Sequence, residues 1–343
     1  MTRAIKIGIA GLGRAGWGMH CRELQGRESM FQIVAACDVI PERRDRMAER
    51  YGCRVYARIE DLIADPEVEL VDIATRSCDH YAHTALALAA GKDVFLEKPM
   101  CVSYAEALQL RDAQAQSPGG RLYIRHNRRF YPDFVHVRQI IASGILGQVY
   151  EIRLARHGYQ RRDDWQTLKA YGGGQLLNWG PHVIDHALRF LESPVARTFS
   201  DLKCVAAVGD AEDHVKIVLQ GTNGRIVDLE ISGGVAIGSP TYLVFGTRGS
   251  LSLSGSEITL KYLDPDRPLP SKEADPGTPG ETFGRPEPLP WVEETLPVQP
   301  GSNAVIWDEL YRAIREGSAF PIILEEAMQV MRVVSAAKEG TDF

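Results

Sequence analysis

The sequence lacks the features that mark several large classes of protein. Its six cysteines are scattered and form no Cys-x-x-Cys pair, which argues against a disulfide framework and against a zinc site. No apolar run is long enough to cross a membrane, and none resembles a signal peptide. The net charge of -6 disfavours a nucleic-acid partner. We therefore expect a cytoplasmic protein with reduced thiols that binds no metal ion, nucleic acid or membrane.

What the first part of the chain does contain is a regular alternation of strand and helix signals. The 343 residues are enough for two domains. Apolar runs typical of buried strands are separated by helical patterns, and strands that alternate with helices predict a parallel, doubly wound sheet. We therefore assign residues 1–126 to an α/β domain of the dinucleotide-binding Rossmann type. Its expected strands are 5–10, 33–37, 70–74, 94–96 and 121–125, with helices at 16–25, from 41, at 80–90 and at 103–116.

The pattern changes after residue 126. Strand signals follow one another closely, with a hairpin turn at Gly221-Thr222-Asn223-Gly224, and such spacing favours a mainly antiparallel sheet. Residues 127–343 are therefore expected to form an α+β domain with an open sheet, in which 265–300, rich in proline and glycine, is irregular. The expected strands are 149–157, 215–219, 226–231, 242–245 and 258–260, and the helices 133–142, 181–191, 303–316 and 325–339.

The motif Gly11-Leu12-Gly13-Arg14-Ala15-Gly16 lies between the first strand and the first helix. Its glycines allow a tight turn, a close approach of a pyrophosphate and close helix–strand packing, and the N–H groups of the helix start bind phosphates. Asp38 ends the second strand, where a carboxylate binds the ribose 2′-hydroxyl and repels a 2′-phosphate. NAD is therefore expected and NADP disfavoured. Arg43 and Arg44 nearby argue the other way, and Asp38 could instead cap the helix that starts at Pro41.

Glu97-Lys98-Pro99 follows a buried strand of the same sheet. Open parallel sheets hold their ligands outside the carboxyl ends of the strands, so Lys98 is expected beside the bound nucleotide. Pro99 keeps Lys98 in an extended or turn conformation, which fixes the point from which its side chain departs. An isolated Lys-Pro pair is usually a surface feature, but the glycine motif upstream favours a functional lysine.

A second dense motif spans residues 172–186. Three consecutive glycines at its start let the backbone approach a ligand closely. Asn178 and His182 are four residues apart, so a helical path places them on one face. If Pro181 starts the helix, the helix dipole lowers the pKa of His182 and keeps its imidazole neutral, as a base must be.

In order and spacing, these motifs resemble those of the Gfo/Idh/MocA family of NAD(P)-dependent oxidoreductases, which includes glucose–fructose oxidoreductase and inositol dehydrogenase. The resemblance covers nearly the full length. It also departs from the family pattern in three places: Asn178 falls where aspartate is common, Arg76 where proline is usual, and the segment 265–300 is long. The matching motifs are the glycine motif at 11–16, the segment 91–99, Asn127-Arg128-Arg129-Phe130, and Gly173-Gly174 with Gly180-x-His182-x-Ile184-Asp185.

The resemblance implies hydride transfer between NAD and a secondary hydroxyl or ketone of a sugar, cyclitol or glycoside. We predict Lys98 and His182 as catalytic residues, with His182 as the general base and Lys98 as the donor to the substrate oxygen. Substrate contacts are predicted at Asn178, Asp185, Trp165 and Arg128. Cofactor contacts are predicted at Gly11, Gly13, Arg14, Ala15, Asp38, Thr75, Glu97 and Lys98.

Two of the substrate assignments have plain structural alternatives. Trp165 lies in a charged loop and could stack on a sugar ring or simply anchor the loop. Asp185 could orient His182 from three residues away, or it could form, with His186, the polar face of an amphipathic helix.

Two other functions are open to the same fold. One is a glycosidase that oxidises its sugar transiently, and the other is a non-catalytic, dinucleotide-sensing regulator, against which the pair Lys98 and His182 argues. We also expect a homodimer or homotetramer that binds a small polyhydroxylated substrate. The second sheet has few helices to cover it, and its strands beyond residue 198 carry apolar residues on both faces.

Overall fold

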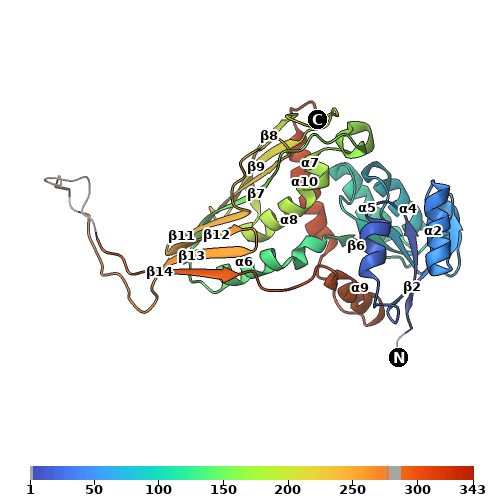
Figure 1. Cartoon of the computed structure of the whole chain (residues 1–343), viewed down its shortest axis with the longest axis horizontal. Coiled ribbons are helices and arrows are strands. Elements are labelled where there is room, and N and C mark those ends of the chain that lie inside the picture. Colours follow the sequence, from blue (N-terminus) through green and yellow to red (C-terminus); the bar gives the residue numbers. More distant parts are fainter. Residues whose placement is uncertain (1–2, 275, 278–286) are drawn as a thin grey trace.

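The computed structural model describes residues 3–274, 276–277 and 287–343. Figure 1 shows two sheets on opposite sides of the molecule, with helices α6 (Pro132–Ala142), α8 (Gly180–Leu191) and α10 (Leu324–Lys338) between them. Within the described residues, no helix has the length and apolar composition that a bilayer crossing requires.

The first sheet has six parallel strands in the order β3-β2-β1-β4-β5-β6. The order reverses between β1 and β4, which is the point where such sheets bind nucleotides. The predicted doubly wound fold is confirmed, and the sequence patterns missed only the short β3 and the helix α3 (Ile59–Ala64). The strands are β1 (Ile5–Ala10), β2 (Phe31–Cys37), β3 (Arg54–Tyr56), β4 (Leu70–Ile73), β5 (Asp93–Glu97) and β6 (Leu122–Arg125).

The helices of this domain start and end at residues that suit those positions. Pro41 occupies the first turn of α2, and Gly52, with φ of 60°, ends it in the left-handed region. The Ser103 side chain accepts a hydrogen bond from the Glu106 N–H at the start of α5. The segment after the glycine motif is a π-helical turn, η1 (Gly16–His20), continued by α1 (Cys21–Glu23). The other helices are α2 (Pro41–Tyr51), α4 (His80–Ala89) and α5 (Tyr104–Gln116).

The second sheet has eight strands in the order β14-β13-β12-β11-β7-β10-β9-β8. Only the β7–β10 pair is parallel, so the prediction of a mainly antiparallel sheet is confirmed. The strands are β7 (Val149–His157), β8 (Val195–Lys203), β9 (His214–Gly221), β10 (Ile226–Ser232), β11 (Tyr242–Gly246), β12 (Gly249–Ser254), β13 (Glu257–Leu263) and β14 (Trp291–Pro297).

The segment 265–300 was expected to be irregular, and this is wrong for its second half. β14 runs from Trp291 to Pro297 and pairs antiparallel with β13 along its whole length. Between its ends the strand has no proline, so every residue can take part in the ladder. Residues 275 and 278–286 of the segment lie outside the described part of the chain.

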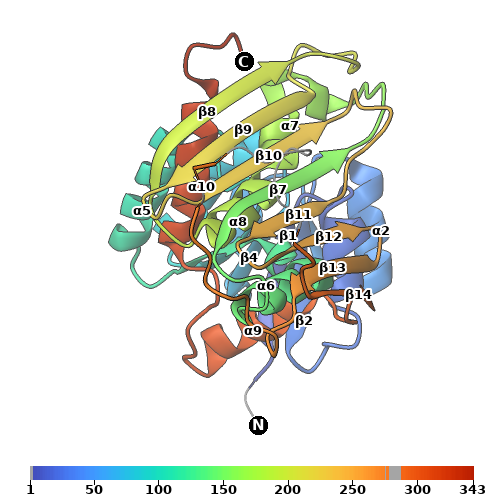
Figure 2. The same cartoon turned by 90° about the vertical axis from the view of Figure 1, so that its left-hand side faces the viewer.

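One face of the second sheet is covered by helices and the other is not (Figure 2). On β9 the side chains of Val215, Ile217 and Leu219 are buried, whereas Lys216 and Val218 on the other face are half-buried. Lys216 forms an ion pair with Asp228 at 2.6 Å on that outer face. The outer face is therefore a mixture of apolar and charged side chains, more polar than the sequence pattern suggested.

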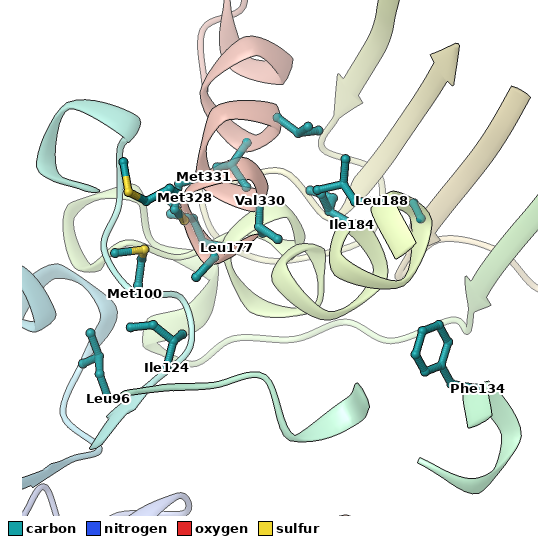
Figure 3. Close-up of a cluster of buried hydrophobic side chains, with 14 of the residues drawn as sticks. Leu96, Met100, Ile124, Phe134, Leu177, Ile184, Leu188, Met328, Val330 and Met331 are labelled. Atoms are coloured by element: carbon teal, nitrogen blue, oxygen red, sulfur yellow. The ribbon is translucent and has the colours of Figure 1, made fainter. Parts of the chain in front are cut away.

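Helix α10 supplies much of the core between the two sheets. Figure 3 shows Met328, Val330 and Met331 of this helix close to Leu177 and Ile184. The buried cluster to which they belong continues into the first sheet, so the two domains share one core.

Helix α9 (Val305–Arg315) packs on the first sheet although it follows the second one in sequence. The Trp307 indole is fully buried and makes edge contacts with Phe31 and Phe95, at ring-centroid distances of 5.4 and 4.8 Å. Its Nε1–H donates to the Glu23 carboxylate at 2.7 Å. The apolar face of the first sheet is therefore completed by the C-terminal part of the chain.

Trp307→Ala should destabilise the protein by about 3–5 kcal/mol, because it empties a large site in the core. Trp291→Ala is the matched control: its side chain lies on the edge strand β14 and is 44% exposed, so the loss should stay below about 1 kcal/mol. Urea unfolding followed by circular dichroism measures both midpoints. Equal shifts in the two variants would show that α9 does not hold the first sheet.

Candidate active site

The glycine motif forms a tight turn between β1 and η1. Gly11 has a φ of +91°, and a Cβ there would lie 2.5 Å from the Ala74 carbonyl oxygen. A Cβ on Gly16 would lie 2.0 Å from the Gly11 oxygen, so both positions require glycine for packing. Gly13, by contrast, faces open space, with nothing nearer than Arg43 at 3.7 Å. The backbone N–H groups of 13–15 have no acceptor among the described residues, which suits a pyrophosphate.

Asp38 stands beside this turn with both carboxylate oxygens engaged. Oδ2 accepts a hydrogen bond from the Leu12 N–H at 2.8 Å, and Oδ1 accepts one from the Ile40 N–H at 2.9 Å. Arg43 lies 3.2 Å from Oδ2, and the Arg44 guanidinium donates to the Asp38 carbonyl at 2.8 Å. Asp38 thus shapes the turn before α2, and Oδ1 can still accept from a ribose hydroxyl, since a carboxylate oxygen accepts more than one hydrogen bond.

Lys98 lies where the carboxyl end of β5 meets the second domain. Its Nζ donates to the carbonyl oxygen of Asn178 at 2.9 Å, and its backbone N–H donates to the Glu97 carboxylate at 2.5 Å. Burial lowers the pKa of Lys98, and the nearby Arg125 and Arg128 add to this, against the opposing effect of Glu97. Lys98 is therefore a hydrogen-bond donor held between the two domains.

His182 lies in the first turn of α8, which follows the short helix α7 (Gln175–Asn178). Pro181 occupies the start of α8, as expected. The side chain is buried, and its Nδ1 has no hydrogen-bond partner among the described residues. Burial lowers the pKa of His182 well below its usual value, and the positive charges of Lys98 and Arg128 lower it further. The imidazole is thus neutral as predicted, but burial and neighbouring cations account for it here.

Asp185 is placed differently from both expectations. Its two oxygens accept hydrogen bonds from Arg129 at 2.7 and 2.8 Å, and it makes no hydrogen bond to His182. Burial opposes its charged form, but Arg129 outweighs this and its pKa is lowered. His186 is also buried, with Nδ1 2.9 Å from the Tyr242 hydroxyl. Both residues are therefore buried polar side chains of α8, not its exposed polar face, and the substrate contact of Asp185 stays a prediction.

The Thr75 and Lys98 turns are connected through His80. Its ring nitrogens lie 2.6 Å from the Pro99 carbonyl oxygen and 3.2 Å from the Thr75 carbonyl oxygen. Arg76, where the family commonly has proline, places its guanidinium 4.6 Å from the ring centre of Tyr171. Arg76 therefore connects the nucleotide-binding side of the first domain with the loop of the second domain that contains Tyr171.

Gln166 was missed by the sequence analysis, because a glutamine in a loop carries no distinguishing pattern. Its Oε1 accepts from Arg14 at 2.7 Å, and its Nε2 donates to the Asn178 side chain at 3.3 Å. It thus links the glycine motif to the expected substrate side. Trp165, its neighbour, begins the short turn η4 (Trp165–Thr167) and is half-buried.

These residues meet at the carboxyl ends of the first sheet's strands. An ammonium (Lys98), a neutral imidazole (His182) and an amide (Asn178) stand next to a phosphate-binding turn. Among the residues that the structure describes, no group of three or more His, Cys, Asp or Glu side chains is arranged to hold a metal ion. An acid–base pair beside a dinucleotide site is the arrangement of a dinucleotide-dependent oxidoreductase.

Comparison with known protein families supports the assignment to the oxidoreductases. Residues 5–125 match the sequence model described as "Oxidoreductase family, NAD-binding Rossmann fold", and residues 134–252 match the "GFO/IDH/MocA C-terminal domain". The chain belongs to the Gfo/Idh/MocA family, and its N-terminal domain is an NAD-binding Rossmann domain.

Individual relatives extend over nearly the whole chain. The scyllo-inositol 2-dehydrogenase (NADP(+)) IolW of Bacillus subtilis is 27% identical, over 98% of this chain and 94% of its own. An oxidoreductase from Bacillus cereus has the same fold, with a TM-score of 0.82, 19% identity and coverage of 99% and 98%. GenD2 from gentamicin A biosynthesis, solved in complex with NAD, has a TM-score of 0.78, 24% identity and coverage of 99% and 96%.

Asp38→Ser should reduce the preference for NAD over NADP by about tenfold, because the repulsion of a 2′-phosphate is lost and Arg43 is released. The ratio of kcat/KM for the two cofactors measures this, with Glu42→Ser on the exposed side of α2 as the control. If the wild type uses NADP at least as well as NAD, then Arg43 or Arg44 governs the pocket and the assignment of Asp38 is wrong.

Proposed function

We propose that this oxidoreductase transfers a hydride between NAD and a secondary hydroxyl or ketone of a cyclitol, sugar or glycoside. The observation that carries the proposal is the juxtaposition of the Lys98 ammonium with the neutral, unpartnered His182 beside the nucleotide-binding turn. A relative named as a scyllo-inositol dehydrogenase supports a polyhydroxylated ring as the substrate.

The bound cofactor supplies the carbon that accepts the hydride. His182 takes the proton of the reacting hydroxyl on an imidazole nitrogen. Lys98 donates a hydrogen bond to the same oxygen and stabilises the negative charge that develops there. Asn178 directs its Oδ1 to Gln166, which leaves its amide N–H groups to orient a neighbouring hydroxyl.

The cellular location of the protein is a second part of the proposal. We place it in the cytoplasm, in keeping with six free cysteines, four of them buried.

We also propose a homodimer or homotetramer that buries the outer face of the second sheet, where Phe199 and Tyr150 are more than half exposed. Light scattering at micromolar concentration should show an oligomer that Phe199→Glu weakens. A wild-type monomer would contradict this interface.

Lys98→Met and His182→Asn should each lower turnover by about a hundredfold or more, the usual scale for one proton-transfer or oxyanion group. Affinity for NAD, measured by fluorescence titration, should stay nearly intact. Lys261→Met and His157→Asn are matched controls, because both side chains lie in the second sheet and pair with glutamates. Full activity in a Lys98 or His182 variant would rule out the role of that residue.

Asn178→Asp should move the acidic limb of the oxidation rate profile to higher pH. Oxidation requires neutral His182, so the rate falls as the pH drops through its depressed pKa. A carboxylate at position 178 favours imidazolium and raises that pKa, which brings the limb closer to neutrality. Initial rates between pH 4.5 and 8.5 measure the shift. An unmoved profile would place Asn178 away from His182, whereas loss of turnover at every pH would mean that its amide donates a required hydrogen bond.

A further inference from the structure

Two arginines share the ring of one tryptophan beside the candidate catalytic residues. The guanidinium carbon of Arg156 lies 3.1 Å from the ring centre of Trp179, and that of Arg128 lies 4.2 Å from it. The two guanidinium carbons are therefore at most 7.3 Å apart, the sum of these distances. Arg128 also lies 4.0 Å from the ring centre of Tyr131.

Neither guanidinium has an anionic partner. Arg128 and Arg156 form no ion pair and donate no side-chain hydrogen bond to any described residue, although each guanidinium carries five N–H donors. The neighbouring arginines contrast with this: Arg125 pairs with Glu97 at 2.8 Å, and Arg129 pairs with Asp185 at 2.7 Å. Burial and the charge of Arg128 lower the pKa of Arg156 to about 10. Two close cations without an ion pair repel each other, and an anion that accepts hydrogen bonds from both guanidiniums would relieve this.

The fold places this pair at the reacting end of the site. Arg156 follows the buried Ile152 and Leu154 on the same face of β7, and at that end of the strand its own side chain is exposed. Trp179 lies between α7 and α8, and its ring centre is 5.7 Å from that of His182. Arg128 comes from η3 (Asn127–Phe130) and lowers the pKa of His182 by its charge, which places it close to the imidazole.

Among the described residues, no carboxylate forms an ion pair with Arg128 or Arg156, and Asp133 acts on Arg128 through its charge alone. The nearby acids Glu97 and Asp185 are both neutralised by arginines other than this pair. Burial lowers the pKa of His126 to about 4, so that imidazole adds no charge. The surroundings of His182 therefore carry the positive charges of Lys98 and Arg128, with Arg156 beside them on the Trp179 ring and no carboxylate in an ion pair with either arginine.

We propose that Arg128 and Arg156 bind an oxyanion of the substrate, so that the polyhydroxylated ring carries a carboxylate or a phosphate monoester. The arginine fork matches both groups through paired hydrogen bonds, and Trp179 keeps the guanidinium planes in place. The oxyanion orients the ring, while His182 and Lys98 act on a hydroxyl at its other side. This assignment rests on the proposed dehydrogenase function and narrows it to acidic substrates.

The test uses the NAD-loaded protein and matched substrates: D-glucose with D-glucuronate and D-glucose 6-phosphate, D-galactose with D-galacturonate, and myo-inositol with its 1-phosphate. NADH absorbance gives kcat/KM, and the shift in thermal unfolding gives binding without turnover. For at least one anionic substrate, kcat/KM should exceed that of its neutral counterpart by about tenfold or more. Arg156→Gln should remove most of that preference. Arg153→Gln, on the outer face of β7 and paired with Glu151, should keep it. Comparison of the carboxylate substrates with the phosphate esters identifies which oxyanion the site binds.

Each outcome has a definite meaning. If kcat/KM is higher for the neutral substrates, or if Arg156→Gln lowers kcat/KM equally for neutral and anionic substrates, the oxyanion site is overturned. If Arg156→Gln lowers NAD affinity in a fluorescence titration, the arginines bind the cofactor phosphates instead, which also overturns it. If nothing is oxidised but anionic members still stabilise the wild type and not Arg156→Gln, the oxyanion site stands and the dehydrogenase proposal fails. Absence of both turnover and stabilisation refutes the oxyanion site.

Discussion

The buried ion pair between Glu97 and Arg125 is the interaction on which the site depends. Arg125 is fully buried and pairs with Glu97 at 2.8 Å and with Glu23 at 2.5 Å. Burial opposes the charged form of Glu97, but Arg125 holds its pKa below the usual range. The same carboxylate accepts the Lys98 N–H, so the ion pair fixes the residue from which the ammonium extends toward Asn178. Loss of either partner would leave an uncompensated charge in the core.

The sequence predicts the fold wherever the helical or strand periodicity of apolar residues is maintained over several residues. The strands of the first sheet are mainly apolar because both faces are covered, whereas apolar and polar residues alternate in strands of the second sheet because only one face is covered. The short β3 and the strand β14 were missed for different reasons. Three residues, Arg54–Tyr56, are too few to show a period, and the flanking prolines of Trp291–Pro297 conceal a regular ladder.

The sequence motifs name residues that the structure brings together, Lys98, Asn178 and His182, but they do not predict the partners of these side chains. Lys98 and His182 stand out because a motif gives each one a position at the end of a regular element. The contact of Asp185 with Arg129 was not predicted, because Arg129 is 56 residues away and lies on another element. Arg156 lies on the face of β7 that carries the buried Ile152 and Leu154, at the exposed end of the strand. A charge in such a row indicates either a partner or a ligand.

The return of α9 to the first sheet has a consequence for synthesis on the ribosome. Residues 1–126 contain all six strands of that sheet, but Trp307, which covers Phe31 and Phe95, is made only after the whole second sheet. During elongation the first sheet therefore exposes an apolar face for as long as more than half of the chain is still being added. N-terminal domains commonly fold as they emerge, and exposed apolar surface promotes aggregation. The topology of the chain thus leaves this apolar face uncovered until α9 has been made.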